Sequence, residues 1–318
     1  MKLIIQIPCY NEAKTLAIAL DALPKHIDGV DEIETLIIND GSSDDTVRVA
    51  KEWGVHHVVG FPNNRGLAKG FMLGLKSCLE RGADIIVNTD ADNQYNADDI
   101  PALIQPVLDG EADIVIGARP ISAIEHFSII KKFLQKLGSN VMRRISGTQV
   151  QDAPSGFRAF SRHAASSLNV FSRYTYTMET IIQAGMHGLS VKNVPVGVNE
   201  DLRPSRLVSS IPSYIRKSVV TMVRIRILYE PMRFFLTLGA VLFSAGLALG
   251  GRFIYFYAQG QGGGHVQSLI LTAVLLLMGF QTGMFGVLGD LLNVNRRLLE
   301  ELTEHKRYQS RLDDNDET

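Results

Sequence analysis

Residues 84–94 read DIIVNTDADNQ, a predicted strand followed directly by a polar cluster. It begins with a short β-branched run, Ile85–Val87, which predicts a buried strand. Three oxygen-bearing side chains follow directly, those of Asp90, Asp92 and Gln94. Mg²⁺ and Mn²⁺ prefer such oxygen ligands and are often shared with substrate phosphates. Aspartates are also common in turns, but the position at the end of a strand favours a metal site.

Short β-branched runs alternate with amphipathic stretches on both sides of this motif, over residues 1–200. The predicted strands are Leu3–Pro8, Thr35–Asn39, His57–Phe61, Asp84–Thr89 and Asp113–Gly117. Helical patterns lie between them, near residues 13–22, 45–53, 67–81 and 99–109. Such alternation predicts an α/β domain with a mostly parallel sheet covered by helices on both faces. Ligands of these folds bind at the carboxyl ends of the strands.

Polar clusters follow the first two predicted strands as well. Residues 10–12 read Tyr-Asn-Glu, and Asp40 stands just before a turn. Beyond that turn, Ser42 or Ser43 is predicted to cap the next helix, with Asp45 in its first turn. Asp40 is instead a candidate acceptor of hydrogen bonds from a nucleotide base or ribose.

Composition excludes several other classes of protein. The 318 residues are 46% hydrophobic and 20% charged, which excludes a disordered chain. The net charge of −1 gives no support for a nucleic-acid partner. Two cysteines, Cys9 and Cys78, make no disulfide framework and fit a reducing compartment. The apolar run after Lys2 is broken by Gln6 and Pro8, so no signal peptide is expected.

Residues 202–229 are basic and apolar, and no acidic residue interrupts them. This composition predicts one or two amphipathic helices lying in a membrane interface, over about residues 201–232. The alternative is an ordinary surface helix with a solvated charged face. The basic residues are Arg203, Arg206, Arg216, Lys217, Arg224 and Arg226.

Two long uncharged stretches follow. Phe234–Gly251 has 18 residues without a charge and Ser268–Gly289 has 22. A membrane span needs about 20 apolar residues for a core of ~30 Å, so residues 233–292 are predicted to form two transmembrane helices. Their expected bounds are about 233–257 and 267–290. The alternative is a pair of buried core helices.

Charge asymmetry gives these spans a predicted orientation. The linker 258–267 has no Lys or Arg, whereas basic residues flank the two outer ends. The positive-inside rule therefore places both termini in the cytoplasm. Residues 293–318 are then a charged cytoplasmic tail, and the chain is expected to be a multi-pass protein of the inner (plasma) membrane.

Four segments in order along the chain resemble the motifs of one enzyme family. Residues 7–12, IPCYNE, look like P-x-Y-N-E, and residues 39–44, NDGSSD, match D-G-S-x-D. Residues 64–66 and 69–70 match an N-x-G segment, and residues 90–94 match the D-x-D metal motif. Together these motifs resemble the family-2 glycosyltransferases of GT-A fold over about the first 200 residues.

Further segments resemble one branch of that family. Residues 117–119, Gly-Ala-Arg, are similar to the G-[ST]-R of dolichyl- and polyprenyl-phosphate sugar synthases, and residues 155–158 match their S-G-F-R. Residues 203–206 stand where many members have R-x-x-G-x-S but lack the glycine. Polymerising relatives carry Q-x-x-R-W, and Trp53, the one tryptophan, lies far upstream. The chain therefore does not resemble a polysaccharide synthase.

The resemblance implies a reaction. One sugar of a UDP- or GDP-hexose is transferred, with inversion, to a polyprenyl phosphate at the cytoplasmic face of the membrane. A divalent metal, Mg²⁺ or Mn²⁺, neutralises the departing diphosphate. The implied partners are the nucleotide sugar, the polyprenyl phosphate and membrane lipid, with a homo-oligomer as a possibility.

The resemblance also implies site residues, with Asp92 and Arg119 as the catalytic pair. The metal ligands are Asp92, assisted by Asp90 and Gln94. The nucleotide pocket consists of Pro8, Tyr10, Asn11, Glu12, Asp40, Asp90 and Ala91. The acceptor phosphate contacts Arg119, Lys131, Lys132, Arg203 and Arg206.

These cations have blander alternatives. The two lysines also fit a solvated helix face, the last two arginines also fit contacts with lipid head groups, and Arg119 can instead pair with a carboxylate such as Asp152. Two rival functions stay open. One is a membrane-anchored glycosyltransferase acting on a glycan or protein hydroxyl, with Glu179 or Asp152 as base. The other is a non-catalytic membrane scaffold.

Overall fold

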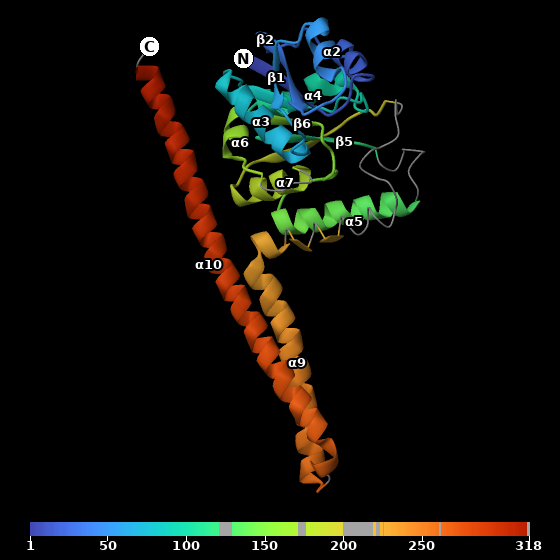
Figure 1. Cartoon of the computed structure of the whole chain (residues 1–318), viewed down its shortest axis with the longest axis vertical. Helices are drawn as coiled ribbons and strands as arrows, with labels where there is room; N and C mark the ends of the chain where they lie inside the picture. Colours follow the sequence, from blue (N-terminus) through green and yellow to red (C-terminus); the bar gives the residue numbers. More distant parts are fainter. Residues whose placement is uncertain are drawn as a thin grey trace. The chain divides into compact units, whose positions relative to one another are not determined.

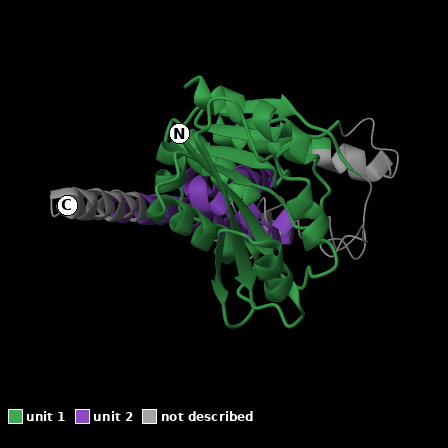
Figure 2. Ribbon diagram, turned by 90° about the horizontal axis from the view of Figure 1, so that it is seen from above, with its two compact units in different colours: residues 1–215 green, residues 216–318 purple. Residues whose placement is uncertain are grey.

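The computed structural model describes residues 1–120, 129–170, 176–199, 219–220, 223–224, 226–260 and 262–316. The chain divides into two compact units, Met1–Ile215 and Arg216–Thr318, which Figure 2 colours separately. In the described residues, the first unit holds a mixed α/β sheet domain and the second a pair of long helices.

The sheet of the first unit has seven strands in the order β3-β2-β1-β4-β6-β5-β7. Neighbouring strands run parallel except at β6, which is antiparallel to both β4 and β5. The mostly parallel sheet predicted from the alternation is confirmed, and all five expected strands are present. The strands are β1 (Lys2–Cys9), β2 (Glu32–Asp40), β3 (His57–Phe61), β4 (Ile85–Asn88), β5 (Ile114–Ala118), β6 (Arg158–Ser161) and β7 (Val191–Pro195).

The four expected helices are also present, with shifted ends. The first begins at Leu16 rather than residue 13, because the carbonyl of Glu12 accepts the amides of Thr15 and Leu16 in a turn. Three further helices and a short 3₁₀ turn complete the described part of this unit. They are α1 (Leu16–Asp21), α2 (Thr46–Trp53), α3 (Leu67–Glu80), η1 (Ala97–Asp99), α4 (Ile100–Leu108), α5 (Ile129–Ser146), α6 (Arg162–Ser167) and α7 (Thr177–Met186).

Alternation along β1 explains how helices cover both faces. Leu3, Ile5 and Ile7 belong to one buried cluster together with residues of α1, α2 and α4. Gln6 points to the opposite face, where α3 packs. A Cβ at Gly74 of α3 would lie 2.3 Å from Gln6 Oε1, so the helix approaches the sheet where only glycine fits. Figure 1 shows α3 and α4 beside the strands.

Register brings the polar clusters to one edge of the sheet. Cys9 of β1 pairs with Asn39 of β2, and Gln6 pairs with Asn88 of β4. The loops that leave these three strands therefore start side by side at the carboxyl edge. This is where an open, mostly parallel sheet places a ligand site.

The second unit contains two helices that are long and apolar enough to cross a membrane. They are α9 (Pro231–Ala258) and α10 (Val266–Asp316), separated by a 3₁₀ turn, η2 (Gly262–His265). The apolar windows lie in Pro231–Ala258 and Val266–Asn295, with mean hydropathies of 1.9 and 1.8. Only 11% and 17% of these windows are buried inside the structure, which disfavours the alternative of core helices in a soluble protein.

Glycines let α9 and α10 approach each other closely. A Cβ at Gly239 would lie 2.7 Å from the carbonyl oxygen of Gly279, and one at Gly279 would lie 2.8 Å from the backbone nitrogen of Phe243. Helices that meet through small residues gain backbone van der Waals contact, the main source of association where lipid surrounds them. The hairpin thus holds together while its outer faces stay apolar and exposed.

The predicted interfacial segment 201–232 lies mostly outside the described residues. Arg203, Arg206, Arg216 and Lys217 all fall there, whereas Arg224 and Arg226 are in helical conformation. The interfacial position of this segment stays a prediction.

Candidate active site

The loops after β1 and β2 are fastened to each other by Asn11. Its backbone amide donates to Ser42 Oγ at 3.0 Å, and its Oδ1 accepts from the backbone amide of Ser43 at 2.8 Å. Asn11 has a φ of +56°, an uncommon conformation that asparagine tolerates better than most residues. Asn11 therefore ties the two loops together, and its contact with a nucleotide stays a prediction.

The predicted cap on α2 is wrong. Asp45 is the N-cap residue and its side chain makes no capping bond. Ser42 does not cap the helix, because its hydroxyl accepts a hydrogen bond from the backbone amide of Asn11. Asp44 provides the bond instead: its carboxylate accepts from the backbone amide of Thr46, at the start of α2, at 3.0 Å. The same carboxylate accepts from the backbone amide of Ala13 at 3.1 Å. The aspartate at the end of D-G-S-x-D thus joins the β2 loop to the β1 loop.

Asp40 is buried and also holds a loop. Its two carboxylate oxygens accept the backbone amides of Arg65 at 2.7 Å and Gly66 at 2.9 Å. These two residues open α3, so the N-x-G segment is drawn to the end of β2. A carboxylate oxygen accepts more than one hydrogen bond, so a ribose or base contact by Asp40 stays a prediction.

The remaining nucleotide candidates surround the end of β1. Tyr10 is 43% exposed there, whereas Glu12 is buried and accepts from the Thr15 hydroxyl at 3.2 Å. The backbone amide of Glu12 donates to Thr46 Oγ1 at 2.8 Å. Pro8 pairs with Ile38 in the sheet register, one residue inside the edge. An exposed aromatic ring beside buried polar anchors is a surface on which a base can stack.

The predicted metal motif lies directly after β4. Asp90, Asp92 and Gln94 are part-buried, Ala91 is buried, and Asp92 Oδ1 accepts from the backbone amide of Gln94 at 3.4 Å. In the described parts of the chain, no three His, Cys, Asp or Glu side chains gather as a metal site. Two carboxylates and an amide suit a cation that takes its other ligands from phosphate oxygens and water.

Gly156 forms the floor under Asp90. A Cβ at this position would lie 3.4 Å from both Asp90 carboxylate oxygens and 3.0 Å from the Tyr176 hydroxyl. The carbonyl of Gly156 accepts from Asn88 Nδ2 at 2.9 Å, and its amide donates to the Tyr95 hydroxyl at 3.0 Å. The S-G-F-R glycine therefore makes room for a carboxylate of the metal motif.

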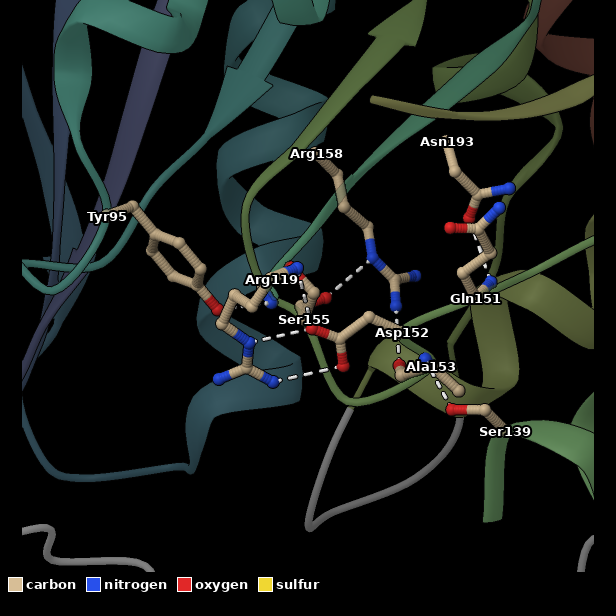
Figure 3. A network of polar contacts seen from close by, with 10 residues as sticks. Tyr95, Arg119, Ser139, Gln151, Asp152, Ala153, Ser155, Arg158 and Asn193 are labelled. Atoms are coloured by element: carbon tan, nitrogen blue, oxygen red, sulfur yellow. Dashed lines mark hydrogen bonds and ion pairs between the residues drawn. The ribbon is translucent and has the colours of Figure 1, made fainter. Parts of the chain in front are cut away.

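Arg119 follows β5 at the same edge of the sheet and forms an ion pair with Asp152. Nε donates at 2.7 Å and Nη2 at 3.1 Å, so the pair is bidentate (Figure 3). The Asp152 side chain is 1% exposed and that of Arg119 is 15% exposed. Burial alone lowers the pKa of Arg119, but Tyr95 and Asp152 raise it above its usual value. The guanidinium is thus a fixed, largely buried cation.

Arg158 supports the loop that carries Asp152. It is fully buried, and its guanidinium donates to the carbonyls of Ala153 and Ser155, both at 2.8 Å (Figure 3). A third bond of 2.8 Å goes to the carbonyl of Thr177. Burial lowers its pKa to about 10. The last residue of S-G-F-R therefore has a structural role, because it holds the loop whose Asp152 pairs with Arg119.

Asn199 contacts the loop that carries the predicted metal motif, residues 90–95, here called the metal loop. The sequence gives no indication of this contact. Asn199 Nδ2 donates to the carbonyls of Asn93 at 2.9 Å and Tyr95 at 3.2 Å, and its backbone amide donates to Gln94 at 2.9 Å. A bridge between Tyr95 and Val198 continues the pairing. Asn199 lies more than 100 residues beyond its partners, which no local pattern reveals.

The structure does not describe the side chains of the other acceptor candidates. Lys131 and Lys132 belong to α5, but their side chains lie outside the described residues, as do Arg203 and Arg206 altogether. The proposed alternative base Asp152 is committed to Arg119. Glu179 is buried in α7.

Comparisons with known proteins identify the family to which the chain is similar. Residues 4–168 match the family model of glycosyl transferase family 2. A UDP-N-acetylglucosamine–dolichyl-phosphate N-acetylglucosaminyltransferase of Methanococcus voltae is 31% identical over 60% of this chain and 82% of its own. An undecaprenyl-phosphate mannosyltransferase of Micrococcus luteus is 27% identical over 70% of this chain and 93% of its own.

A solved structure supports the fold. The glucosyl-3-phosphoglycerate synthase of Mycobacterium tuberculosis, crystallised with Mn²⁺, uridine diphosphate and phosphoglyceric acid, superposes with a TM-score of 0.53. Its sequence is 20% identical, and the match covers 70% of this chain and 78% of that one.

Proposed function

This chain belongs to glycosyl transferase family 2, and we propose that it transfers one sugar from a nucleotide sugar to a polyprenyl phosphate. One observation carries the proposal: the oxygen-rich D-x-D loop and the cation Arg119 follow strands that end at one edge of the sheet. The relatives named for dolichyl and undecaprenyl phosphate support a lipid phosphate as acceptor.

The chemistry requires two anions to meet. A phosphate oxygen of the acceptor attacks the anomeric carbon from the face opposite the leaving group. The bond from that carbon to the diphosphate breaks, the diphosphate leaves with the electron pair, and the configuration inverts. Because the acceptor is already an oxyanion, the site needs positioning and positive charge more than a strong base.

The chain's residues divide these tasks. Asp92, with Asp90 and Gln94, would hold a divalent cation, Mg²⁺ or Mn²⁺, which supplies positive charge to the leaving diphosphate. Arg119 binds the acceptor phosphate, and Asp152 fixes the plane of the guanidinium. The loops held by Asn11 and Asp40 form the walls of the nucleotide pocket.

The donor is a UDP- or GDP-hexose, and the reaction takes place at the cytoplasmic face of the membrane. In this proposal α9 and α10 span the membrane, the basic segment 201–232 lies in the interface, and both termini are cytoplasmic. This topology delivers a lipid phosphate to the same side as a soluble nucleotide sugar.

The test uses membranes that contain the full chain, a panel of labelled UDP- and GDP-hexoses and added polyprenyl phosphate. Labelled product that extracts into organic solvent and depends on the added lipid is the expected result. Asp92→Asn is the matched control and should lose most of the transfer. Label found only on protein or water-soluble glycan would instead identify a hydroxyl acceptor.

A further inference from the structure

We propose that Asn199 is a positioning residue for the loop of Asp90, Asp92 and Gln94, and that its side-chain amide sets the affinity of this loop for a divalent cation. The inference rests on the proposed function, because that function assigns the cation to the loop.

Asn199 holds three consecutive loop residues at once. Its Nδ2 donates to the carbonyls of Asn93 at 2.9 Å and Tyr95 at 3.2 Å. Its backbone amide donates to the carbonyl of Gln94 at 2.9 Å. A single amide group with two N–H donors fits two converging carbonyls, and few other side chains do. The side chain of Asn199 is part-buried, so these bonds are partly shielded from competing water.

The loop needs such support because of its own geometry. Asn93, between Asp92 and Gln94, has a φ of +56°, an uncommon conformation that asparagine tolerates better than most residues and that turns the chain between these two side chains. The bond within the loop, from the Gln94 amide to Asp92 Oδ1, is long at 3.4 Å. The loop therefore depends on contacts from outside itself to keep Asp92 and Gln94 in one arrangement.

Asp90 has a separate support. It lies next to the end of β4, and Gly156 packs against its carboxylate. Loss of the Asn199 side-chain amide should thus leave Asp90 in place and shift the backbone at Asn93 and Tyr95, which displaces Asp92 and Gln94 from their positions. Partners that orient metal ligands typically change metal affinity or activity by about 10–100-fold when removed.

The experiment compares Asn199→Ala and Asn199→Asp with the unchanged chain. Both variants keep the backbone bond to Gln94, and the aspartate keeps the size of the side chain while losing both N–H donors. Mn²⁺ is titrated into the purified full chain in detergent, with UDP or GDP, whichever raises the melting temperature of the unchanged chain. Free Mn²⁺ is read by electron paramagnetic resonance.

We expect the dissociation constant for Mn²⁺ to rise about tenfold or more in both variants. Excess Mn²⁺ should restore turnover, and the melting temperature without metal should change little. Asn193→Ala is the matched control. Its amide also fastens a site loop, with Nδ2 donating to the Gln149 carbonyl and Oδ1 accepting from Gln151, both at 2.9 Å. It does not touch the metal loop, so its Mn²⁺ affinity should stay unchanged.

Three results would overturn the inference alone: unchanged Mn²⁺ affinity in folded Asn199 variants, an equal loss in Asn193→Ala, or failure of both Asn199 variants to fold. If the unchanged chain binds no Mn²⁺, the metal assignment of the proposed function fails first and this inference fails with it.

Discussion

The ion pair between Arg119 and Asp152 decides how much positive charge the site can offer a lipid phosphate. Asp152 is buried and fully committed, so it orients the planar guanidinium and offsets part of its charge. An arriving phosphate would share this cation rather than find an isolated one. The acceptor role of Arg119 and its pairing with Asp152, two interpretations open from sequence, are therefore compatible.

Arg119→Ala should lose acceptor use by about 10²-fold, because a charged hydrogen-bond partner is removed. It should also lose stability, on the order of 3–5 kcal/mol, because the buried Asp152 carboxylate loses its bidentate cationic partner. The double variant Arg119→Ala/Asp152→Asn separates the two effects. It should regain most of the melting temperature without regaining acceptor turnover. Normal steady-state acceptor KM and kcat in Arg119→Ala would remove this residue from the site.

Gly156→Ala should impair transfer with only a modest loss of stability. The new Cβ would press on the Tyr176 hydroxyl at 3.0 Å and on Asp90 at 3.4 Å. Tyr176 cannot yield easily because its ring stacks on Phe71 at 3.9 Å, so the Asp90 carboxylate must move. We expect kcat to fall by about tenfold or more, since small displacements of positioned groups cost that much.

Gly70→Ala is the control for this change. Its Cβ would meet only Ile38 at 3.6 Å, an ordinary contact, within helix α3. Alanine there should stabilise the chain by roughly 0.5–1 kcal/mol and leave kcat unchanged. If both alanine variants turn over normally, the floor under Asp90 has no role in transfer.

Single residues were predictable where their signal is local. Asp90, Asp92 and Gln94 lie together after one β-branched run, and the register of the sheet explains their shared edge with Asp40. Asp152 appeared from the sequence only as an alternative partner of Arg119 and as the base of a rival function, since it lies 33 residues from Arg119. The role of Asn199 could not be predicted, because it bonds to backbone carbonyls, and every residue type has a backbone carbonyl.

At the level of elements, the five predicted strands are the β-branched ones, and the two missed strands lack that pattern. β6 reads Arg-Ala-Phe-Ser and β7 reads Val-Lys-Asn-Val-Pro. β6 also runs antiparallel between β4 and β5. Its partners are distant in the sequence, so no local turn motif predicts this pairing. Gly156, two residues before β6, lies under Asp90, and Arg158, the first residue of β6, holds the loop that carries Asp152, so the missed strand positions both features of the site.

The link between the β1 and β2 loops should weaken in acid. Burial alone raises the pKa of Asp44, but the Thr46 hydroxyl and the amides of Ala13 and Thr46 lower it below its usual value. The stabilisation is therefore present above the unfolded pKa of about 3.9 and is lost as the pH falls through the lower folded pKa. Melting temperatures of Asp44→Asn should decline less steeply than those of the unchanged chain below about pH 4.

Asp45→Asn serves as the comparison. Asp45 pairs with Arg48 on the exposed face of α2, and exposed pairs contribute little. Its melting curve should follow that of the unchanged chain. A parallel acid decline in all three proteins would mean that other carboxylates control acid unfolding.

For the molecule as a whole, composition and structure agree on two units that differ in how they bury apolar side chains. The first unit buries its apolar side chains around the sheet, whereas α9 and α10 leave most of theirs exposed and meet through glycines. That difference was visible in the uncharged stretches of the sequence. The interfacial segment between the units was predicted from its basic and apolar residues, and its structure lies largely outside the described residues.

The two spans lead to a prediction of orientation. The linker 258–267 has no Lys or Arg, and the outer ends carry Arg224, Arg226, Arg233, Arg296 and Arg297. Such an asymmetry places the linker outside and both termini in the cytoplasm.

Labelling of introduced cysteines by a membrane-impermeant maleimide measures this directly. The native thiols, Cys9 and Cys78, are buried, and burial raises the pKa of both, so their background labelling should be low. Gln261→Cys should react in intact cells, whereas Asp313→Cys in the tail should react only after lysis. The reverse pattern would put the D-x-D loop on the side away from cytoplasmic nucleotide sugars. The proposed reaction would then lack its donor, whatever the geometry of the site.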